Sequence, residues 1–315
     1  MATRQIFSVE RRVGAALSVA ALALASCRDE PTSNPPAAGS SAGPSAASPA
    51  GSTPVEASAI KEEAERQGRE AVAKSMNPKG LSPYSGPVGG VRGIVKVVGD
   101  PPPLVAEMVS KLPAEGCPRA HELQRKLYRQ GADRTLADVL VTVTEYTGFV
   151  QPKQDATRVE IKGCAFDSKV VAMVFGQRLD VFNLDNQAYM PRLVGTPTYA
   201  LRVAMPGGSA VPLFAPRAGP FILADQTREY VRADLYVLNY PTFDVTGLDG
   251  QFQIEGVPVG EAKVTAFVPG FGKVLNQRVK VQAGAQENVT FEFNFSESEY
   301  QSRSRAAAQE TEAPK

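Results

Sequence analysis

A long series of short β-branched or aromatic segments, each bounded by turn residues, dominates the chain between Val91 and Phe295. In LADVLVTVTEYTG, for example, Val139, Val141 and Val143 fall on one face of an extended strand. Many short strands at close spacing are typical of antiparallel sandwiches. The sequence therefore predicts an all-β protein. The other predicted strands are VRGIVKVVGD, TRVEIKG, VVAMVFG, RLDVFN, TYALRVAM, GPFILA, RADLYVLN, FDVTG, QFQIEGV, EAKVTAFV, KVLNQRVKVQ and ENVTFEFNF.

The N-terminus has the pattern of an exported protein. Basic residues precede the apolar run VGAALSVAALALAS, which is short for a membrane span of about 20 apolar residues but has the length of a signal peptide. The run ends at LASC, which resembles the lipobox of bacterial lipoproteins, where the cysteine is lipidated and becomes the new N-terminus. The resemblance implies a signal peptide over residues 1–27, lipid on Cys27 and, through that lipid, a membrane as partner. An ordinary signal peptide that ends near a cysteine is the alternative.

The segments that flank the predicted strands are poor in apolar residues. Residues 28–58 are rich in Ala, Ser, Pro and Gly, so we expect a disordered tether over 28–88, with a marginal helix within 59–75. Residues 297–315 are expected to form a disordered tail. Arg28, rather than Asp, follows the predicted lipidated cysteine, which favours the outer membrane if the sorting rule of well-studied Gram-negative bacteria applies. The predicted location is the bacterial cell envelope, with a lipid anchor.

The cysteine count then suggests a disulfide. If Cys27 carries lipid, the remaining cysteines are Cys117 and Cys164. Exported compartments permit disulfides, so we predict that these two are paired. Two separate buried thiols are the alternative, because sequence alone does not fix the distance between their Cα atoms.

Two stretches resemble known families of β-sandwich. Residues 89–238 resemble the cupredoxin-like (plastocyanin-like) domains, through VRGIVKVVGDPP, LADVLVTV, GCAFDSKVVAMVFGQRLDVFNLD and GPFILADQTREYVRADLYVLN. Residues 239–296 resemble the carboxypeptidase-regulatory-like, transthyretin-type modules, through NYPTFDVTGLDGQFQIEGVPVGEAKVTAFVPG, with its turn at Asp249-Gly250. Together the resemblances imply two antiparallel β-sandwich domains after a disordered lipoprotein tether.

The cupredoxin resemblance implies a copper site with two histidines, one cysteine and a weak methionine ligand. Carried over position by position, the first histidine falls on Tyr189, and the later ligands fall near Asp225, Arg228 and Val231. The loop over 223–234 contains no Cys, His or Met, so we expect no metal and no other cofactor. A copper or electron-transfer protein with an atypical site is the alternative; such a site would combine His121 with Met173, Met190 or Met205.

The same loop carries charged residues that could contact a partner. Asp225, Arg228, Glu229 and Arg232, together with Tyr189, form the predicted partner patch. A solvated loop with surface ion pairs, each worth under about 1 kcal/mol, is the alternative.

Charge and motifs exclude several classes of function. The chain has 34 Lys and Arg against 33 Asp and Glu, so it lacks the basic surplus expected of a nucleic-acid-binding protein. It also lacks the H-E-x-x-H and P-loop motifs and a plausible Ser/His pair, so we expect no enzyme activity. The sequence predicts a non-enzymatic, membrane-anchored interaction or scaffold protein with an envelope protein or a glycan as partner. A carbohydrate-binding surface protein, with its site on the second sandwich, is a further alternative.

Overall fold

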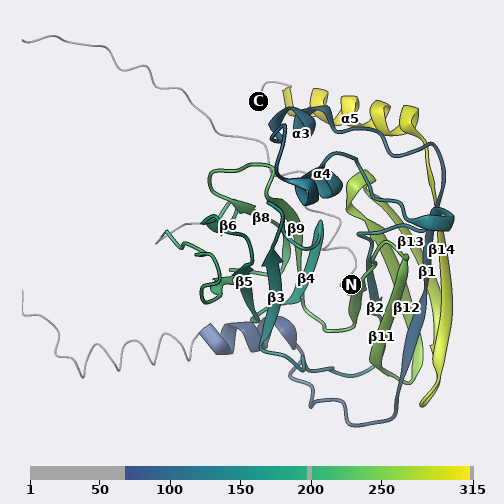
Figure 1. The fold of residues 1–315 in the computed structure, drawn as a ribbon. Coiled ribbons are helices and arrows are strands. Elements are labelled where there is room, and N and C mark those ends of the chain that lie inside the picture. Colours follow the sequence, from purple (N-terminus) through teal and green to yellow (C-terminus); the bar gives the residue numbers. More distant parts are fainter. Residues whose placement is uncertain (1–67, 197–200, 313–315) are drawn as a thin grey trace, which may run out of the picture. The chain divides into compact units, whose positions relative to one another are not determined.

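The computed structural model describes residues 68–196 and 201–312, and they form an all-β protein (Figure 1). The predicted signal peptide, Cys27 and most of the predicted tether lie outside these described residues, although residues 68–76 are helical. The helices are α3 (Ala106–Lys111), α4 (Pro118–Gln124), α5 (Glu297–Glu312) and the 3-10 turns Ala132–Arg134 and Pro269–Phe271. The strands are β1 (Val88–Gly99), β2 (Leu140–Thr144), β3 (Ala156–Ile161), β4 (Val170–Val174), β5 (Arg178–Asn183), β6 (Pro191–Leu193), β7 (Val211–Phe214), β8 (Gly219–Asp225), β9 (Arg232–Leu238), β10 (Phe243–Val245), β11 (Gln251–Pro258), β12 (Gly260–Val268), β13 (Lys273–Val281) and β14 (Gln286–Phe295).

The strand pairing differs from the division at residue 238 that the sequence suggested. β1 lies between β11 and β14, and β2 lies between β10 and β12. We call the sandwich formed by β1, β2 and β10–β14 the outer sandwich. Strands β3–β9 form a second sandwich, the inserted sandwich, whose sequence lies wholly between β2 and β10. The residues 89–238 therefore do not form one sandwich, because both strands before Thr144 have all their partners after residue 238.

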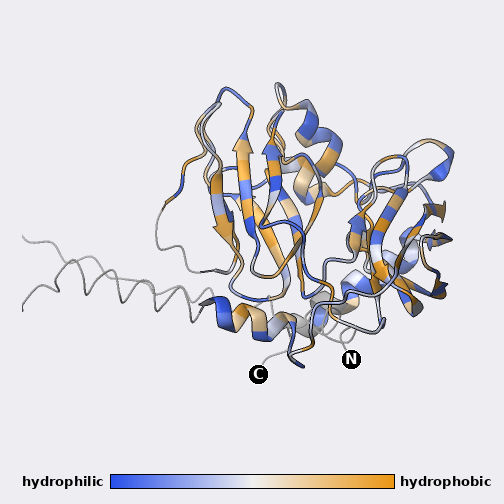
Figure 2. Ribbon diagram, turned by 90° about the horizontal axis from the view of Figure 1, so that it is seen from below, coloured by the Kyte–Doolittle hydropathy of each residue, from blue (hydrophilic) through white to orange (hydrophobic). Residues whose placement is uncertain are grey.

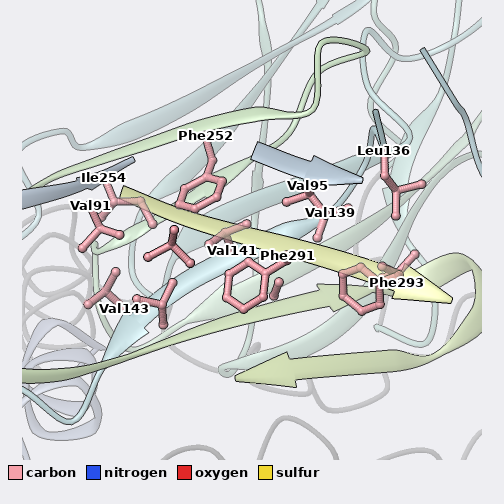
Figure 3. Packing of buried hydrophobic residues seen from close by; sticks show 14 of the residues in the cluster. Val91, Val95, Leu136, Val139, Val141, Val143, Phe252, Ile254, Phe291 and Phe293 are labelled. Atoms are coloured by element: carbon pink, nitrogen blue, oxygen red, sulfur yellow. The ribbon is translucent and has the colours of Figure 1, made fainter. Parts of the chain in front are cut away.

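Alternating side chains build the core of the outer sandwich. Along β14, Val289, Phe291, Phe293 and Phe295 are buried, whereas the residues between them are exposed. This period of two is what a strand with one face on a core requires. Figure 3 shows Phe291 and Phe293 in the same cluster as Val139, Val141 and Val143, which the sequence placed on one face of a strand. Figure 2 shows the matching alternation of hydrophobic and hydrophilic residues along the strands.

A glycine permits the close approach of β1 and β14. A Cβ atom at Gly93 would collide with the backbone carbonyl of Val289 on the neighbouring strand. These two strands run parallel, although β1 begins the described sheets and β14 ends them. Glycine therefore has a steric role here that strand propensity alone does not reveal.

The sandwiches are mixed rather than purely antiparallel. In the inserted sandwich the sheets have the orders β3-β5-β7 and β4-β9-β8-β6, and the pairs β3/β5 and β4/β9 are parallel. All five residues of β4 are buried, which explains its continuous apolar sequence VVAMV. Parallel pairs need crossover connections, so local turn signals could not predict them.

The C-terminal segment contains a helix where we expected a disordered tail. Its start is fixed by Asp100, whose carboxylate accepts a hydrogen bond from the backbone N–H of Glu297 at 2.8 Å. Tyr300 packs against the outer core, and the guanidinium of Arg303 donates to the carbonyl of Phe271 at 3.1 Å. These few contacts, together with helix-favouring Ala, Glu and Gln residues, stabilise α5 although none of its described side chains is fully buried.

None of the helices in the described part of the chain is both long enough and apolar enough to cross a membrane.

Because β1 and β2 pair only with strands that come after residue 238, a fragment that ends at the boundary predicted from the sequence should leave both of them unpaired. In a fragment of residues 89–238, β1 and β2 lose every strand with which they pair, and β1 keeps only the isolated bridge of Lys96 with Thr135, whereas β9 keeps β4 and β8. Hydrogen exchange followed by mass spectrometry should show the amides of Val91 and Val95 exchanging at the rates of an unfolded chain. In the whole chain the same amides should be protected. Protection of β1 in the fragment would contradict this strand order.

Candidate functional site

Tyr189 occupies the position at which the cupredoxin resemblance places a copper ligand, and it is completely buried. It follows the turn after β5, in which Asn183 accepts a hydrogen bond from the N–H of Asp185 at 3.0 Å. The Tyr189 hydroxyl donates to Asp185 Oδ2 at 2.7 Å and accepts from Gln187 Nε2 at 2.6 Å. The phenol is therefore bonded on both sides by residues from its own turn.

The carboxylate of Asp185 connects this turn to the predicted disulfide. It accepts hydrogen bonds from the backbone N–H groups of Gly163 at 2.7 Å and Cys164 at 2.8 Å. Both residues have positive φ, +63° and +62°, so their N–H groups form a concave site suited to an anion. Without this carboxylate, two buried donors would lose their partner.

The structure joins Cys117 and Cys164, the pair for which a bridge was predicted, with their Cα atoms 5.2 Å apart. The bridge ties the start of α4 to the turn that holds Asp185. Closing the intervening 47-residue separation stabilises the folded state by about 4 kcal/mol in the chain-entropy model.

Asp225 closes the site from the other side, at the end of β8. Its side chain is inaccessible to solvent, and it accepts hydrogen bonds from the backbone N–H groups of Met190, Thr227 and Arg228 and from the Thr227 hydroxyl. Burial acts to raise the pKa of this carboxyl, but the hydrogen bonds outweigh burial and lower the pKa below its ordinary value of 3.8. Asp225 therefore remains charged and organises the loop that follows it.

Arg228 covers the buried tyrosine. Its guanidinium carbon lies 4.9 Å from the centre of the Tyr189 ring, and its nitrogens donate to the Ala188 carbonyl at 3.1 Å and to Gln187 Oε1 at 3.2 Å. We call Tyr189, Asp185, Gln187, Asp225 and Arg228 the tyrosine network. Burial and the neighbouring Asp185 carboxylate raise the pKa of Tyr189, so the phenol stays protonated.

The residues of the tyrosine network do not fit a blue-copper centre. Such a centre needs imidazole and thiolate ligands, but this position offers carboxylates, an amide, a phenol and a guanidinium. Cys164, a cysteine that contacts this network, is bonded to Cys117 and so offers no thiolate. Among the described residues there is also no cluster of three His, Cys, Asp or Glu side chains that could hold a metal.

The residues of the atypical copper site have separate environments. The imidazole of His121 is hydrogen-bonded to the Pro113 carbonyl at 2.8 Å, while Met173 is buried in the core of the inserted sandwich. Met205 is 56% exposed on another segment. This arrangement offers no support for a shared metal site.

The predicted partner patch is not one exposed surface. Tyr189 and Asp225 are buried, and Arg228 keeps 28% of its side chain exposed. Glu229 is exposed and pairs with Lys111 of α3 at 2.7 Å, whereas the backbone carbonyl of Arg232 accepts from Gln124 of α4 at 2.7 Å. The loop therefore has a structural role in addition to any contact with a partner.

Sequence reasoning missed two members of the network. Asp185 and Gln187 lie in the turn NLDNQ, residues 183–187, and the Asn-x-Asp spacing is a signal for a side-chain-bonded turn. Their contact with Cys164 depends on a segment 21 residues earlier in the chain, so the sequence could not reveal it.

Comparison with solved structures finds partial matches to cupredoxins. The copper-containing nitrite reductase from Thermus scotoductus SA-01 is 14% identical, with a TM-score of 0.23 over 31% of this chain and 25% of that chain. A reduced amicyanin variant is 15% identical, with a TM-score of 0.24 over 31% of this chain and 98% of that chain. No family model and no curated protein matches the sequence. At these TM-scores the likeness carries no argument about chemistry, which rests on the residues described above.

The buried carboxylate of Asp225 predicts a pH-dependent stability difference. Asp225→Asn replaces a charged acceptor, so the free energy of unfolding at pH 7 should fall by about 2–3 kcal/mol. In the folded wild type the pKa lies below 3.8, so the carboxylate's contribution is present above that pH and is lost as the pH falls through the folded-state pKa.

Urea unfolding measured at several pH values between 7 and 2 checks this prediction. The difference between wild type and Asp225→Asn should narrow as the pH falls below 3.8. Asp249→Asn, at an exposed turn, serves as the control and should change stability little. A difference that stays constant with pH would show that the charge of Asp225 does not stabilise the loop.

Proposed function

We propose that this protein is a non-enzymatic interaction module of the bacterial cell envelope, anchored through lipid on Cys27. Its inserted sandwich would dock another envelope protein. The observation that carries this proposal is an exposed apolar strip beside the tyrosine network. The strip consists of Leu201, Val203 and Met205, which are 66%, 41% and 56% exposed.

The strip has a fixed orientation. Ala204, in its centre, is buried and exchanges two backbone hydrogen bonds with Tyr189, at 2.8 and 3.2 Å. Because neighbouring residues of an extended segment point to opposite sides, burial of Ala204 directs Val203 and Met205 to solvent. The tyrosine network thus holds the strip from beneath.

Asn183 anchors the same segment at its far side. Its side-chain amide donates to the carbonyls of Ala204 at 2.8 Å and Gln187 at 2.7 Å. The backbone carbonyl of Asn183 accepts from the N–H of Gly207 at 3.1 Å. Leu184, which follows Asn183 in the chain, is a further exposed apolar residue, at 48%.

Three exposed apolar side chains within five residues, on a segment that is hydrogen-bonded at Ala204, support protein docking. Scattered single apolar residues are ordinary on protein surfaces, but contiguous patches mark interaction sites. Methionine is also enriched in the centres of interfaces because its flexible side chain adapts to a partner. A preorganised surface also loses less conformational entropy on binding. These features favour a protein partner with a complementary apolar patch.

Substitutions in the strip test the proposal. Val203→Asp combined with Met205→Lys should reduce the recovery of the cross-linked partner from intact cells by about tenfold or more, because desolvating each new charge costs more than 1.4 kcal/mol. The matched control is Phe214→Lys. Phe214 is 61% exposed in the wild type, and it pairs with Arg178, at the end of β5 away from Asn183 and the strip.

Quantitative mass spectrometry of the cross-linked material gives the readout, and circular dichroism verifies that each variant is folded. The proposal predicts that the same protein is recovered with wild type and with Phe214→Lys, and is lost with the double variant. Equal recovery with all three chains would contradict docking at the strip.

A further inference from the structure

A polar groove of ≈ 470 Å³ lies between the inserted sandwich, α4 and the outer sandwich. Arg158 of β3 and Asp167, which precedes β4, belong to the inserted side. Arg119 of α4 and Asp244 of β10 line it from other elements, and Phe243 and Leu248 provide apolar surface. Cavities of this size at the contact of two domains are where small ligands most often bind.

The arginines of the groove are already neutralised. Arg158 pairs with Glu160 at 2.8 Å, and Arg119 pairs with Glu122 at 2.6 Å. A third lining residue, Arg129, is buried and makes a two-pronged pair with Asp138, at 2.7 Å for both bonds. A free anion would therefore gain little from these guanidinium groups.

The carboxylates of the groove, unlike its arginines, are not paired with a described side chain of opposite charge. Within the described part of the chain, neither Asp167 nor Asp244 has a lysine or arginine within salt-bridge distance. Arg119 donates to the backbone carbonyl of Asp167 at 3.0 Å rather than to its carboxylate. Asp244 accepts from the N–H groups of Val245 and Gln253, both at 2.8 Å, and burial raises its pKa. An anionic ligand would be opposed by both carboxylates.

The groove thus offers donors and acceptors side by side, and its two unpaired carboxylates leave it with an excess of negative charge that disfavours an anion. A hydroxyl group can donate to a carboxylate and accept from a guanidinium at the same time, so it satisfies both kinds of side chain. The apolar surface of Phe243 and Leu248 suits the C–H face of a sugar ring. We propose that this groove binds a neutral saccharide.

This inference goes beyond the proposed protein docking. None of the strip residues lines the groove, so the two proposals can fail separately. It also moves the glycan hypothesis from the second sandwich predicted by the sequence to the contact between both sandwiches.

Calorimetric titration of the full chain tests the proposal. The probes are the neutral oligosaccharides cellotetraose, maltotetraose and tetra-N-acetylchitotetraose, with tetragalacturonate as an acidic comparison. We expect saturable binding of at least one neutral probe. Arg158→Met should weaken that binding about tenfold or more, because a hydrogen bond from a charged group is lost.

The matched control is Arg278→Met. Like Arg158, Arg278 is a solvent-exposed strand arginine, and it pairs with Glu145, but it does not line the groove. Thermal melting verifies that both variants are folded. A second variant, Asp167→Asn, should also weaken binding, because it replaces one acceptor oxygen of the carboxylate with an NH2 donor and removes the charge, while the side chain keeps its shape.

Three results would overturn the proposal. They are the absence of binding by every neutral probe, binding by tetragalacturonate alone, and equal affinity of wild type and Arg158→Met for the neutral probe.

Discussion

The pairing of β1 with β11 and β14 is the constraint on which the rest of the structure depends. These contacts join Val91 to Ile254 on one side and to Glu287 on the other. Because the outer sandwich cannot close until the end of the chain is in place, everything between β2 and β10 must fold as an insertion. The chain therefore passes between the two sandwiches twice, after β2 and before β10. The polar groove lies where the two sandwiches meet.

Within the insertion, hydrogen bonds and a disulfide hold the loops around Tyr189 together. Tyr189, Asp185 and Asp225 connect β5, β6 and β8 to the turn at Cys164. Hydrogen bonds to the charged carboxylates of Asp185 and Asp225 are stronger than neutral ones, and the disulfide adds a covalent tie. The 201–205 segment, in which Ala204 is hydrogen-bonded to Tyr189, has exposed apolar side chains beside this network.

The sequence predicted the kind of structure better than its connectivity. The alternation of Val139, Val141 and Val143 identified β2 as a strand, because periodicity is a local property, but it did not show that both faces of β2 are buried. It could not identify Phe267 as the residue opposite Leu140, because strand pairing depends on tertiary contacts between distant segments. The same reason explains the missed sandwich boundary. The tail was judged by its scarcity of apolar residues, whereas Asp100, almost two hundred residues earlier, caps α5.

The candidate site divides in a similar way. Absence of histidine, cysteine and methionine from the 223–234 loop could be read directly from the sequence. The burial of Tyr189 and Asp225 could not, because exposed and buried loop residues share the same polar composition. Their roles became clear only when their hydrogen-bond partners were known.

Copper titration of the full chain tests the central claim, that hydrogen bonds rather than a metal complete this site. Cu(I) and Cu(II) would be added to the oxidised protein, followed by visible absorption, electron paramagnetic resonance and competition with a chelator. The account predicts no thiolate-to-copper absorption and full removal of copper by a weak chelator. One tightly held copper per chain, with spectra that change on Tyr189→Phe, would contradict it.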